Sequence, residues 1–410
     1  MRITIINQFY TPDISPTAHL SASLAEHLAK KGHDVTVVTS WGGYSEDARA
    51  QKGATERENG VRVKRIWTPK LGKSSHIRRI IDYACFYAGT YISMLLLKRQ
   101  DVVISLTTPP LIAWAAIIHK WFKRKTKIIL WNMDCYPELP ERAGVFKMEG
   151  FVSKVLQFLN RGLFKRLDHL VCLDTAMVDL LMSRYKPKKR ELPISIIPNW
   201  EDADFFPADA KHEPWEGIDR LGLTGKFTVV YLGNMGYGHD FATMLDAAEI
   251  LKDNDDIRFL FIGGGKRKDP TAQEAERRDL TNVIVHSYVD KSETPNVMAG
   301  ATCALITLRD DMLGVMSPSK MHANLAMRLP VLYVGPEGCN VDDAIKRFGC
   351  GSSIRIGDVE GLVNQIRTLA ENKDKLEAAR ESARRAFDES YNDQSAHARF
   401  DEVLEQVAGA

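Results

Sequence analysis

The sequence predicts an α/β protein of two doubly wound domains, each a parallel sheet with helices on both faces. Three observations predict this class. Short β-branched runs alternate with stretches whose apolar residues recur at helical spacing, as in repeated β-α-β units. The alternation stops near residue 200, in a stretch rich in Pro, Asp and Gly, and then restarts. The length of 410 residues suits two domains of ordinary size.

The first half begins with a β-α-β unit. We expect a strand at residues 3–7, a helix at 18–31 that follows Ser15 and Pro16, and a second strand at 35–39. Further strands with helices between them are expected at 61–67, 101–106, 127–131, 169–173 and 194–198. We therefore expect a first domain over residues 1–200 and a linker over residues 201–225.

The second half repeats the pattern. Strands are expected at 228–232, 258–262, 283–286, 303–307 and 331–334, and helices at 240–252, 319–327, 360–372, 374–386 and 396–407. These elements predict a second doubly wound domain over residues 226–390. The last helix, within residues 391–410, is expected to pack back on the first domain.

Composition excludes several classes of protein. With 44% hydrophobic and 26% charged residues, the chain is neither disordered nor fibrous. Its six cysteines stand singly, which predicts neither a disulfide framework nor a thiolate zinc site. The first residues lack the apolar core of a signal peptide. We therefore expect a cytoplasmic protein in a reducing compartment.

Positive charge gathers in one part of the first domain. Residues 60–127 contain fourteen Lys and Arg residues but only two Asp, in a chain of net charge +2. The apolar run at 80–97 is barely long enough to span a bilayer and contains Asp82, so a spanning helix is not expected. Two interpretations remain for residues 70–127: helices packed in a soluble core, or a basic, aromatic face that rests on an anionic leaflet. The charge favours the second.

Several strand-to-helix loops carry residues suited to ligand binding, because ligands of such sheets bind at the carboxyl ends of the strands. The loop Gly233-Asn-Met-Gly-Tyr-Gly-His-Asp240 brings three glycines to the start of a helix but matches neither the dinucleotide nor the P-loop pattern. It is either an anion-binding loop, which includes His239, or a plain tight turn. Gly263-Gly-Gly-Lys-Arg-Lys268 is either a turn with a solvated basic run or a backbone platform beside a nucleotide.

Two further motifs carry hydroxyl or charged side chains. Ser317-Pro-Ser-Lys320 opens the helix expected at 319–327, and is either a diphosphate cradle or a simple helix cap. Asp134-Cys-Tyr-Pro-Glu138 follows an apolar strand, where two carboxylates are costly to bury unless they are hydrogen-bonded or functional. The alternative is that Glu138 caps a turn.

These motifs, in this order, resemble the family-4 retaining glycosyltransferases, and most closely the branch that makes bacterial polysaccharides and lipid-linked oligosaccharides. The resemblance covers essentially the whole chain. The matching stretches are Ile5-Ile-Asn-Gln-Phe-Tyr-Thr-Pro-Asp13, Leu24-Ala-Glu-His-Leu-Ala-Lys-Lys-Gly-His-Asp-Val-Thr-Val-Val-Thr39, Asp134-Cys-Tyr-Pro-Glu138, Ile197-Pro-Asn-Trp200, Leu232-Gly-Asn-Met-Gly236, Ile262-Gly-Gly-Gly265, Ser317-Pro-Ser-Lys320 and Leu329-Pro-Val331.

The resemblance implies a GT-B fold, in which two Rossmann-like domains flank a cleft, the first binding the acceptor and the second the nucleotide-sugar. It implies no metal and no cofactor besides the donor itself. For the donor, it implies contacts from Gly233, Asn234, Gly236, Gly264, Gly265, Tyr288, Ser319 and Lys320. The composition of the same loops adds His239 and Ser317 as candidate donor contacts. Thr17 and Ala18 would lie in the first-domain loop that faces the leaving phosphate, and Asp134 would contact a sugar hydroxyl or the acceptor.

The chain also departs from the family pattern. Two glutamates with seven residues between them are common in the family, yet Val315 and Ala323 stand at the expected positions. The usual Arg and Lys after the first strand of the second domain are also missing, since Asn234 and His239 occupy that loop.

The sequence thus predicts a metal-independent retaining glycosyltransferase, peripheral to the cytoplasmic face of a membrane. It would move a sugar from a nucleoside diphosphate donor to a lipid-linked or surface-glycan acceptor, with Asp134, Glu138 and Lys320 as catalytic residues. No nucleic-acid partner is expected. Two alternatives remain open: a sugar-nucleotide epimerase of the same fold, and a non-catalytic scaffold or partner subunit, which Val315 and Ala323 motivate.

Overall fold

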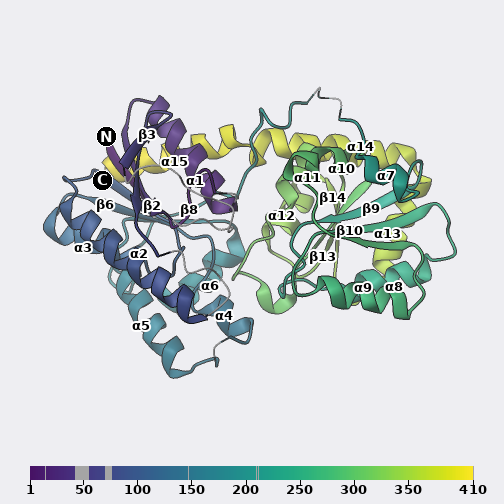
Figure 1. Cartoon of the computed structure of the whole chain (residues 1–410), viewed down its shortest axis with the longest axis horizontal. Helices are drawn as coiled ribbons and strands as arrows, with labels where there is room; N and C mark the ends of the chain where they lie inside the picture. Colours follow the sequence, from purple (N-terminus) through teal and green to yellow (C-terminus); the bar gives the residue numbers. More distant parts are fainter. Residues whose placement is uncertain are drawn as a thin grey trace. The chain divides into compact units, whose positions relative to one another are not determined.

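The computed structural model describes residues 1–13, 15–41, 55–69, 76–145, 147–208, 210 and 212–409, with the backbone alone at 76–80 and 291. The chain forms two compact units (Figure 1). Unit 1 comprises Met1–Leu173, Met177–Ile197 and the C-terminal residues from His397. Unit 2 comprises Asp174–Ala176 and Pro198–Ala396.

Unit 1 is built on an eight-stranded sheet in the order β3-β4-β2-β1-β5-β6-β7-β8. All neighbouring strands pair in parallel except β3 and β4. The four central strands are almost wholly buried, as expected of a parallel sheet with both faces covered. The strands are β1 (Arg2–Ile6), β2 (Asp34–Ser40), β3 (Thr55–Glu58), β4 (Val61–Ile66), β5 (Val102–Ser105), β6 (Lys127–Trp131), β7 (His169–Cys172) and β8 (Ile194–Ile196).

Helices cover both faces of this sheet (Figure 1). They are α1 (Pro16–Lys30), α2 (His76–Leu96), α3 (Trp114–Phe122), α4 (Glu138–Arg142), α5 (Phe151–Phe164), α6 (Thr175–Tyr185) and most of α15 (Asp393–Gly409). Helix α15 lies along α1, where His397 Nε2 is 2.9 Å from Ser23 Oγ and Asp401 pairs with His27 and Lys31.

Unit 2 has a six-stranded, all-parallel sheet in the order β11-β10-β9-β12-β13-β14. Its strands are β9 (Phe227–Leu232), β10 (Ile257–Ile262), β11 (Val283–His286), β12 (Cys303–Thr307), β13 (Val331–Val334) and β14 (Gly351–Ile354). Its helices are α7 (Glu216–Arg220), α8 (Ala242–Ile250), α9 (Lys268–Arg277), α10 (Thr294–Ala299), α11 (Met321–Ala326), α12 (Asn340–Phe348), α13 (Val359–Glu371) and α14 (Lys373–Ala386), with short turns of other helix types at Lys291–Glu293, Asp310–Met312 and Phe387–Tyr391.

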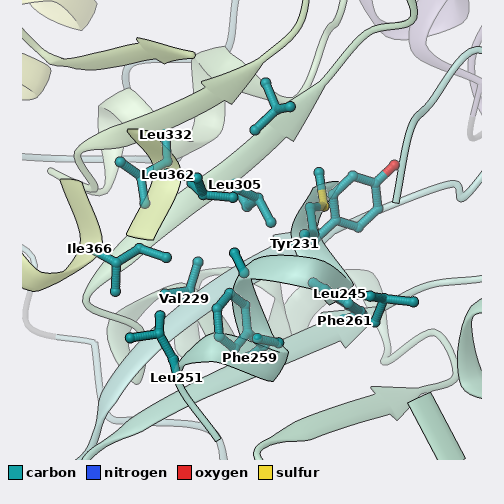
Figure 2. Close-up of a cluster of buried hydrophobic side chains, with 14 of the residues drawn as sticks. Val229, Tyr231, Leu245, Leu251, Phe259, Phe261, Leu305, Leu332, Leu362 and Ile366 are labelled. Atoms are coloured by element: carbon teal, nitrogen blue, oxygen red, sulfur yellow. The ribbon is translucent and has the colours of Figure 1, made fainter. Parts of the chain in front are cut away.

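The core of unit 2 lies on both faces of its sheet. On one face, Val229 and Phe259 pack against Leu245 of α8 and Ile366 of α13 (Figure 2). On the other, Val230 and its neighbours pack against α7 and α10. Figure 2 shows the ring of Tyr231 at the edge of the first cluster, with its hydroxyl pointing away from the other labelled side chains.

The predicted fold class is confirmed: two parallel-sheet α/β units. Strands β6, β11, β12 and β13 have the predicted bounds. Two edge strands, β3 and β14, were not predicted, because β3 is charged and β14 is polar and begins with glycine. Helix α7 lies inside the predicted linker.

The apolar, basic segment predicted over residues 70–127 contains α2 and α3. Within the described ranges, no helix is long and apolar enough to cross a membrane. Trp121 and Phe122 at the end of α3 are 56% and 69% exposed, and Arg124 and Lys125 beyond them are also exposed. Residues 70–75 and the side chains of Arg78 and Arg79 lie outside what the structure describes.

Candidate functional site

The strand order of unit 2 changes direction between β9 and β12. From β9 the chain moves outward through β10 and β11, and then returns to β12 on the other side. Loops that leave the carboxyl ends of strands at such a switch point form the usual ligand site of an open parallel sheet. Here they are the loops that follow β9, β10 and β12, and all three contain residues that the sequence predicted for a donor site.

The loops after β9 and β10 are in direct backbone contact. Met235 donates its N–H to the carbonyl of Gly264 over 2.6 Å, and the Arg267 N–H donates to the carbonyl of Met235 over 2.9 Å. A Cβ atom on Gly263 would lie 1.9 Å from the Gly233 carbonyl oxygen. Glycine is therefore required here by close approach of two backbones rather than by a simple turn.

Lys320 lies across the loop after β9. Its ammonium donates to the Tyr231 hydroxyl at 2.8 Å and the Asn234 carbonyl at 3.3 Å, and lies 3.2 Å from Nε2 of His239. These three acceptors match the three N–H donors of an ammonium. A Cβ on Gly233 would lie 2.7 Å from Cε of Lys320, so the glycine also makes room for this side chain.

His239 is held as a neutral acceptor. Its Nδ1 lies 2.7 Å from the carbonyl oxygen of Thr307, which can only accept, so Nδ1 carries the proton and Nε2 is free to accept from Lys320. Burial, together with the charge of Lys320, lowers the pKa of His239 to about 3. Burial also lowers the pKa of Lys320, to about 7. The site thus holds one lysine whose charge changes near neutral pH.

The other predicted donor residues lie around this centre. The Asn234 carbonyl accepts from both Tyr231 and Lys320. Tyr288 is 58% exposed, and its ring packs so closely on Gly264 that a Cβ there would lie 2.6 Å from it. Gly236 and Gly265 lie in the two contacting loops, where a Cβ on Gly265 would lie 2.4 Å from Oδ1 of Asn234.

The helix expected from residue 319, opened by Ser317 and Ser319, begins later than predicted. Helix α11 begins only at Met321, and no side chain caps it. Both serines instead lie in the loop before it, where Ser319 is exposed and Oγ of Ser317 is buried without a hydrogen-bond partner. The motif therefore presents Lys320 from a loop, not from the first turn of a long helix.

In unit 1, Asp134 follows β6. The N–H groups of Asp134 and Met133 both lie 3.2 Å from Oγ1 of Thr107, which follows the neighbouring strand β5. Burial raises the pKa of the Asp134 carboxyl to about 6. Asp134 also lines a small cavity of about 20 Å³, together with Tyr136 and Asn160.

Glu138 does not face such an opening. Its side chain is fully buried, accepts a short hydrogen bond from the Tyr185 hydroxyl, and pairs with Arg184 at 3.3 Å. Glu138 therefore lies in the packing of α4 against α6, and its predicted contact with substrate stays a prediction.

Thr17 and Ala18 lie in the first turn of α1 rather than in the loop before it. Ala18 is fully buried, and its N–H donates to the capping Oγ of Ser15 at 3.3 Å. The Thr17 carbonyl accepts from the Asn7 side chain at 3.2 Å. The loop that follows β1 is therefore tied to the helix start by Asn7.

Val315 and Ala323 sit in apolar surroundings. Val315 is fully buried, and Ala323 packs against the core cluster around Val230. Neither position offers a polar contact to a ligand. Among the described residues, no group of three or more His, Cys, Asp and Glu side chains is arranged to hold a metal ion.

Three residues in or beside these loops were not predicted from the sequence. Tyr231 and Thr307 belong to strands β9 and β12, where they look like ordinary sheet residues. Arg267 follows the glycines after β10, and its Nε is buried without a hydrogen-bond partner. The only signal for the strand residues is their place at the carboxyl ends of the two strands at the switch point.

Two doubly wound parallel-sheet units, one with glycine-rich loops at its switch point, define an open α/β class whose ligands bind at the carboxyl ends of the strands. Two family models narrow this class: the glycosyl transferase 4-like domain matches residues 18–200, and glycosyl transferases group 1 matches residues 216–386. The chain belongs to the family-4 glycosyltransferases, as predicted.

Individual relatives agree with this assignment. The chain is 26% identical over 281 residues, 67% of each chain, to the probable glycosyltransferase WbjE of Pseudomonas aeruginosa. It is 20% identical over 399 residues, 95% of this chain and 97% of the relative, to WcaI of Escherichia coli K12, which is named for colanic acid biosynthesis.

Solved structures share the fold. The glycosyltransferase WaaG, involved in lipopolysaccharide biosynthesis, matches with a TM-score of 0.67 and 16% identity over the whole of both chains. HepE of Anabaena, solved in complex with UDP-glucose, matches with a TM-score of 0.69 and 12% identity over 99% of this chain and all of the other.

Proposed function

We propose that this glycosyltransferase is a retaining enzyme of polysaccharide biosynthesis. It transfers a sugar from a nucleoside diphosphate donor to a lipid-linked or surface-glycan acceptor at the cytoplasmic face of a membrane. The relatives WcaI and WaaG, named for colanic acid and lipopolysaccharide biosynthesis, support the pathway class. HepE, solved with UDP and with UDP-glucose, supports a nucleotide-sugar donor.

One observation carries the proposal: the Lys320 ammonium lies against the glycine-rich loop after β9, at the switch point of unit 2. A diphosphate bound there would meet the backbone of a glycine-rich loop together with a positive charge. Arg267, whose Nε is buried without a partner, adds a second positive charge in the adjoining loop.

In the proposed retaining transfer, the Lys320 ammonium stabilises the leaving diphosphate. The bond between the sugar's anomeric carbon and the diphosphate oxygen breaks, and a bond to the acceptor oxygen forms on the same face of the sugar. The acceptor proton passes to the departing diphosphate. Catalysis then rests on stabilising the leaving diphosphate and on positioning the acceptor, with no protein nucleophile. No resident metal or cofactor enters this scheme.

Asp134 is proposed to contact the acceptor or a sugar hydroxyl. It follows the carboxyl end of β6, and its backbone is fixed by Thr107. A carboxyl group whose pKa is raised to about 6 by burial is still mainly ionised at neutral pH, so it acts as an acceptor of hydrogen bonds from hydroxyls.

Association with an anionic membrane is proposed for the basic, aromatic end of α3. Trp121, Phe122, Arg124 and Lys125 are all exposed. Aromatic rings at the headgroup level and cations near anionic lipids each favour binding at a leaflet.

Calorimetric titration with UDP, GDP, TDP and ADP tests the proposal. We expect one of them to bind wild-type protein, and to bind the Lys320→Ala variant at least tenfold more weakly. A non-catalytic scaffold, for which the apolar Val315 and Ala323 argue, binds none of the four. An epimerase of the same fold would bind one, but would interconvert sugar nucleotides with no acceptor present.

A further inference from the structure

Helix α5 of unit 1 exposes an unusually apolar face. Phe151 and Phe158 are 83% and 73% exposed, and Val152 and Val155 are 51% and 40% exposed. Val145 and Met148, just before the helix, are 68% and 59% exposed. Phe151, Val155 and Phe158 are spaced i, i+4 and i+7, so they form one continuous stripe on the helix.

The buried face of the same helix carries polar side chains. Ser153, Gln157 and Asn160 are buried along most of its length, and the apolar Leu163 and Phe164 are buried at its C-terminal end. Asn160 donates to the carbonyl of Tyr136 at 2.5 Å, and Ser153 to that of Lys147 at 3.5 Å. A surface helix of a water-soluble protein has the opposite arrangement, with the apolar stripe facing the core. Asn160 and Ser153 thus use their side chains for internal hydrogen bonds, while the apolar stripe is exposed.

Basic side chains flank the stripe. Lys154, Arg161 and Lys165 follow at intervals of seven and four residues, so they run along one side of it, and all three are exposed. Lys147 and Arg166 at the two ends are exposed as well, with Glu149 as the acidic residue in this stretch. An apolar stripe with cations along its edge matches the lipid–headgroup boundary of an anionic leaflet.

Helix α5 also adjoins α3. A Cβ on Gly162 would lie 3.0 Å from the Trp114 ring, and the Arg166 guanidinium lies 5.6 Å from the centre of that ring. Helices α3 and α5 are therefore neighbours in the same helical layer of unit 1 (Figure 1).

From these observations we infer that α5 is a membrane anchor whose Phe151, Val155 and Phe158 side chains insert into an anionic leaflet. The inference rests on the proposed membrane association and adds to it a second, apolar contact surface. Because apolar insertion is little screened by salt, α5 supplies the part of the binding that persists when salt weakens the attraction of the basic residues.

The test measures flotation of the full-length protein with vesicles of phosphatidylglycerol and phosphatidylethanolamine, at low and high salt. Three variants are compared with the wild type. The first replaces Phe151, Val155 and Phe158 with serine. The second replaces Lys123, Arg124 and Lys125 with glutamate. The third is a matched control in unit 2, where Phe205 and Ile250, which are 49% and 44% exposed, are replaced with serine.

We expect the α5 variant to lose binding roughly tenfold or more at both salt concentrations, because the stripe contributes through burial of apolar area. The α3 variant should lose binding mainly at low salt, and the control should bind like the wild type. Nucleotide binding by unit 2 is measured in parallel and should be unchanged in all three.

Three outcomes would overturn the inference. If only the α3 variant loses binding, membrane association stands and α5 is not an anchor. If the wild type never floats with the vesicles, both membrane contacts fail, while nucleotide binding still tests the glycosyltransferase proposal. If the wild type is a dimer that the α5 variant dissociates, the stripe is an interface between two copies of the chain.

Discussion

Among single residues, Lys320 matters most for the proposed donor site. Its ammonium is surrounded by neutral acceptors, a hydroxyl, a carbonyl and the Nε2 of a neutral histidine, and none of these groups cancels its charge. A buried positive charge without a negative partner lowers the stability of the folded protein but can bind an anionic ligand. Such a cost is typical of functional sites.

Replacing Lys320 with alanine should remove this charge from the transition state. We expect a loss of about 2.7–4 kcal/mol in stabilisation of the transition state, roughly 10²–10³-fold in rate, as for other electrostatic groups at developing charge. The measurement is sugar transfer at saturating donor. Lys252→Ala, at an exposed lysine in the same unit, is the control. Unchanged transfer by Lys320→Ala would remove Lys320 from the site.

The lowered pKa of Lys320 predicts a pH dependence. Below about pH 7 the free enzyme carries the ammonium, and above it the amine is neutral and no longer attracts the diphosphate. Since kcat/KM reports the free enzyme, it should fall as pH rises through about 7. In Lys320→Arg the guanidinium stays protonated, so this fall should disappear from the profile. A wild-type kcat/KM that stays level well above neutral pH would contradict the assignment.

Asp134 should matter for transfer and not for folding. Burial raises the pKa of Asp134, so its ionised form destabilises the folded state. Asp134→Asn should therefore leave the free energy of unfolding within about 1 kcal/mol of the wild-type value or raise it slightly. Transfer should fall roughly a hundredfold. Thermal unfolding and transfer assays measure the two effects. A large drop in the melting temperature with normal specific activity would favour a structural role.

The residues predicted for the site differ in how well the sequence locates them. Lys320, Asn234 and His239 lie close together because they occupy the loops after β9 and β12. The sequence predicts both loops, but the structure shows that the two strands are neighbours. Glu138 could not be placed in this way. Its partners Tyr185 and Arg184 are more than forty positions away, and only the packing of α6 turns its side chain inward.

At the scale of elements, the loops after β9 and β10 behave as one backbone unit. They share the hydrogen bonds of Met235 with Gly264 and with Arg267. The glycine patterns were visible in the sequence, but their mutual contact was not, because it depends on β9 and β10 being neighbours in the sheet. Tyr231 and Thr307 were not predicted for the same reason, because their contacts with Lys320 and His239 depend on which strands are neighbours.

Gly263→Ala should separate these two loops. Its Cβ would meet the backbone carbonyl of Gly233, which cannot move as a side chain can. We expect a loss of about 1–3 kcal/mol in stability and loss of nucleotide binding. Gly264→Ala meets instead the ring of Tyr288, which is half exposed and can turn away, so its loss of stability should be smaller. Chemical denaturation and calorimetry measure both effects. Equal stability losses in the two variants would contradict this reading.

At the scale of the whole molecule, periodicity and turn residues were enough to predict two doubly wound units. Long buried strands such as β6 and β12 carry a strong apolar signal, and their bounds were predicted correctly. The unpredicted strands lie at sheet edges, where burial is partial and the pattern weakens. Helix α5 was predicted only as one of the helices between strands, and the exposure of Phe151 and Phe158 comes from the structure alone.

The activity proposed for this chain is transfer of sugar from a nucleotide-sugar to an acceptor. The most direct measurement incubates purified protein with a panel of nucleotide-sugars and a mixed lipid-acceptor extract, and follows products by mass spectrometry. We predict an acceptor mass increased by one sugar residue, with release of an equal amount of nucleoside diphosphate. Lys320→Ala should form both products roughly 10²–10³-fold more slowly. Interconverted sugar nucleotides without any glycosylated acceptor, or no turnover of a donor that binds, would contradict the claim.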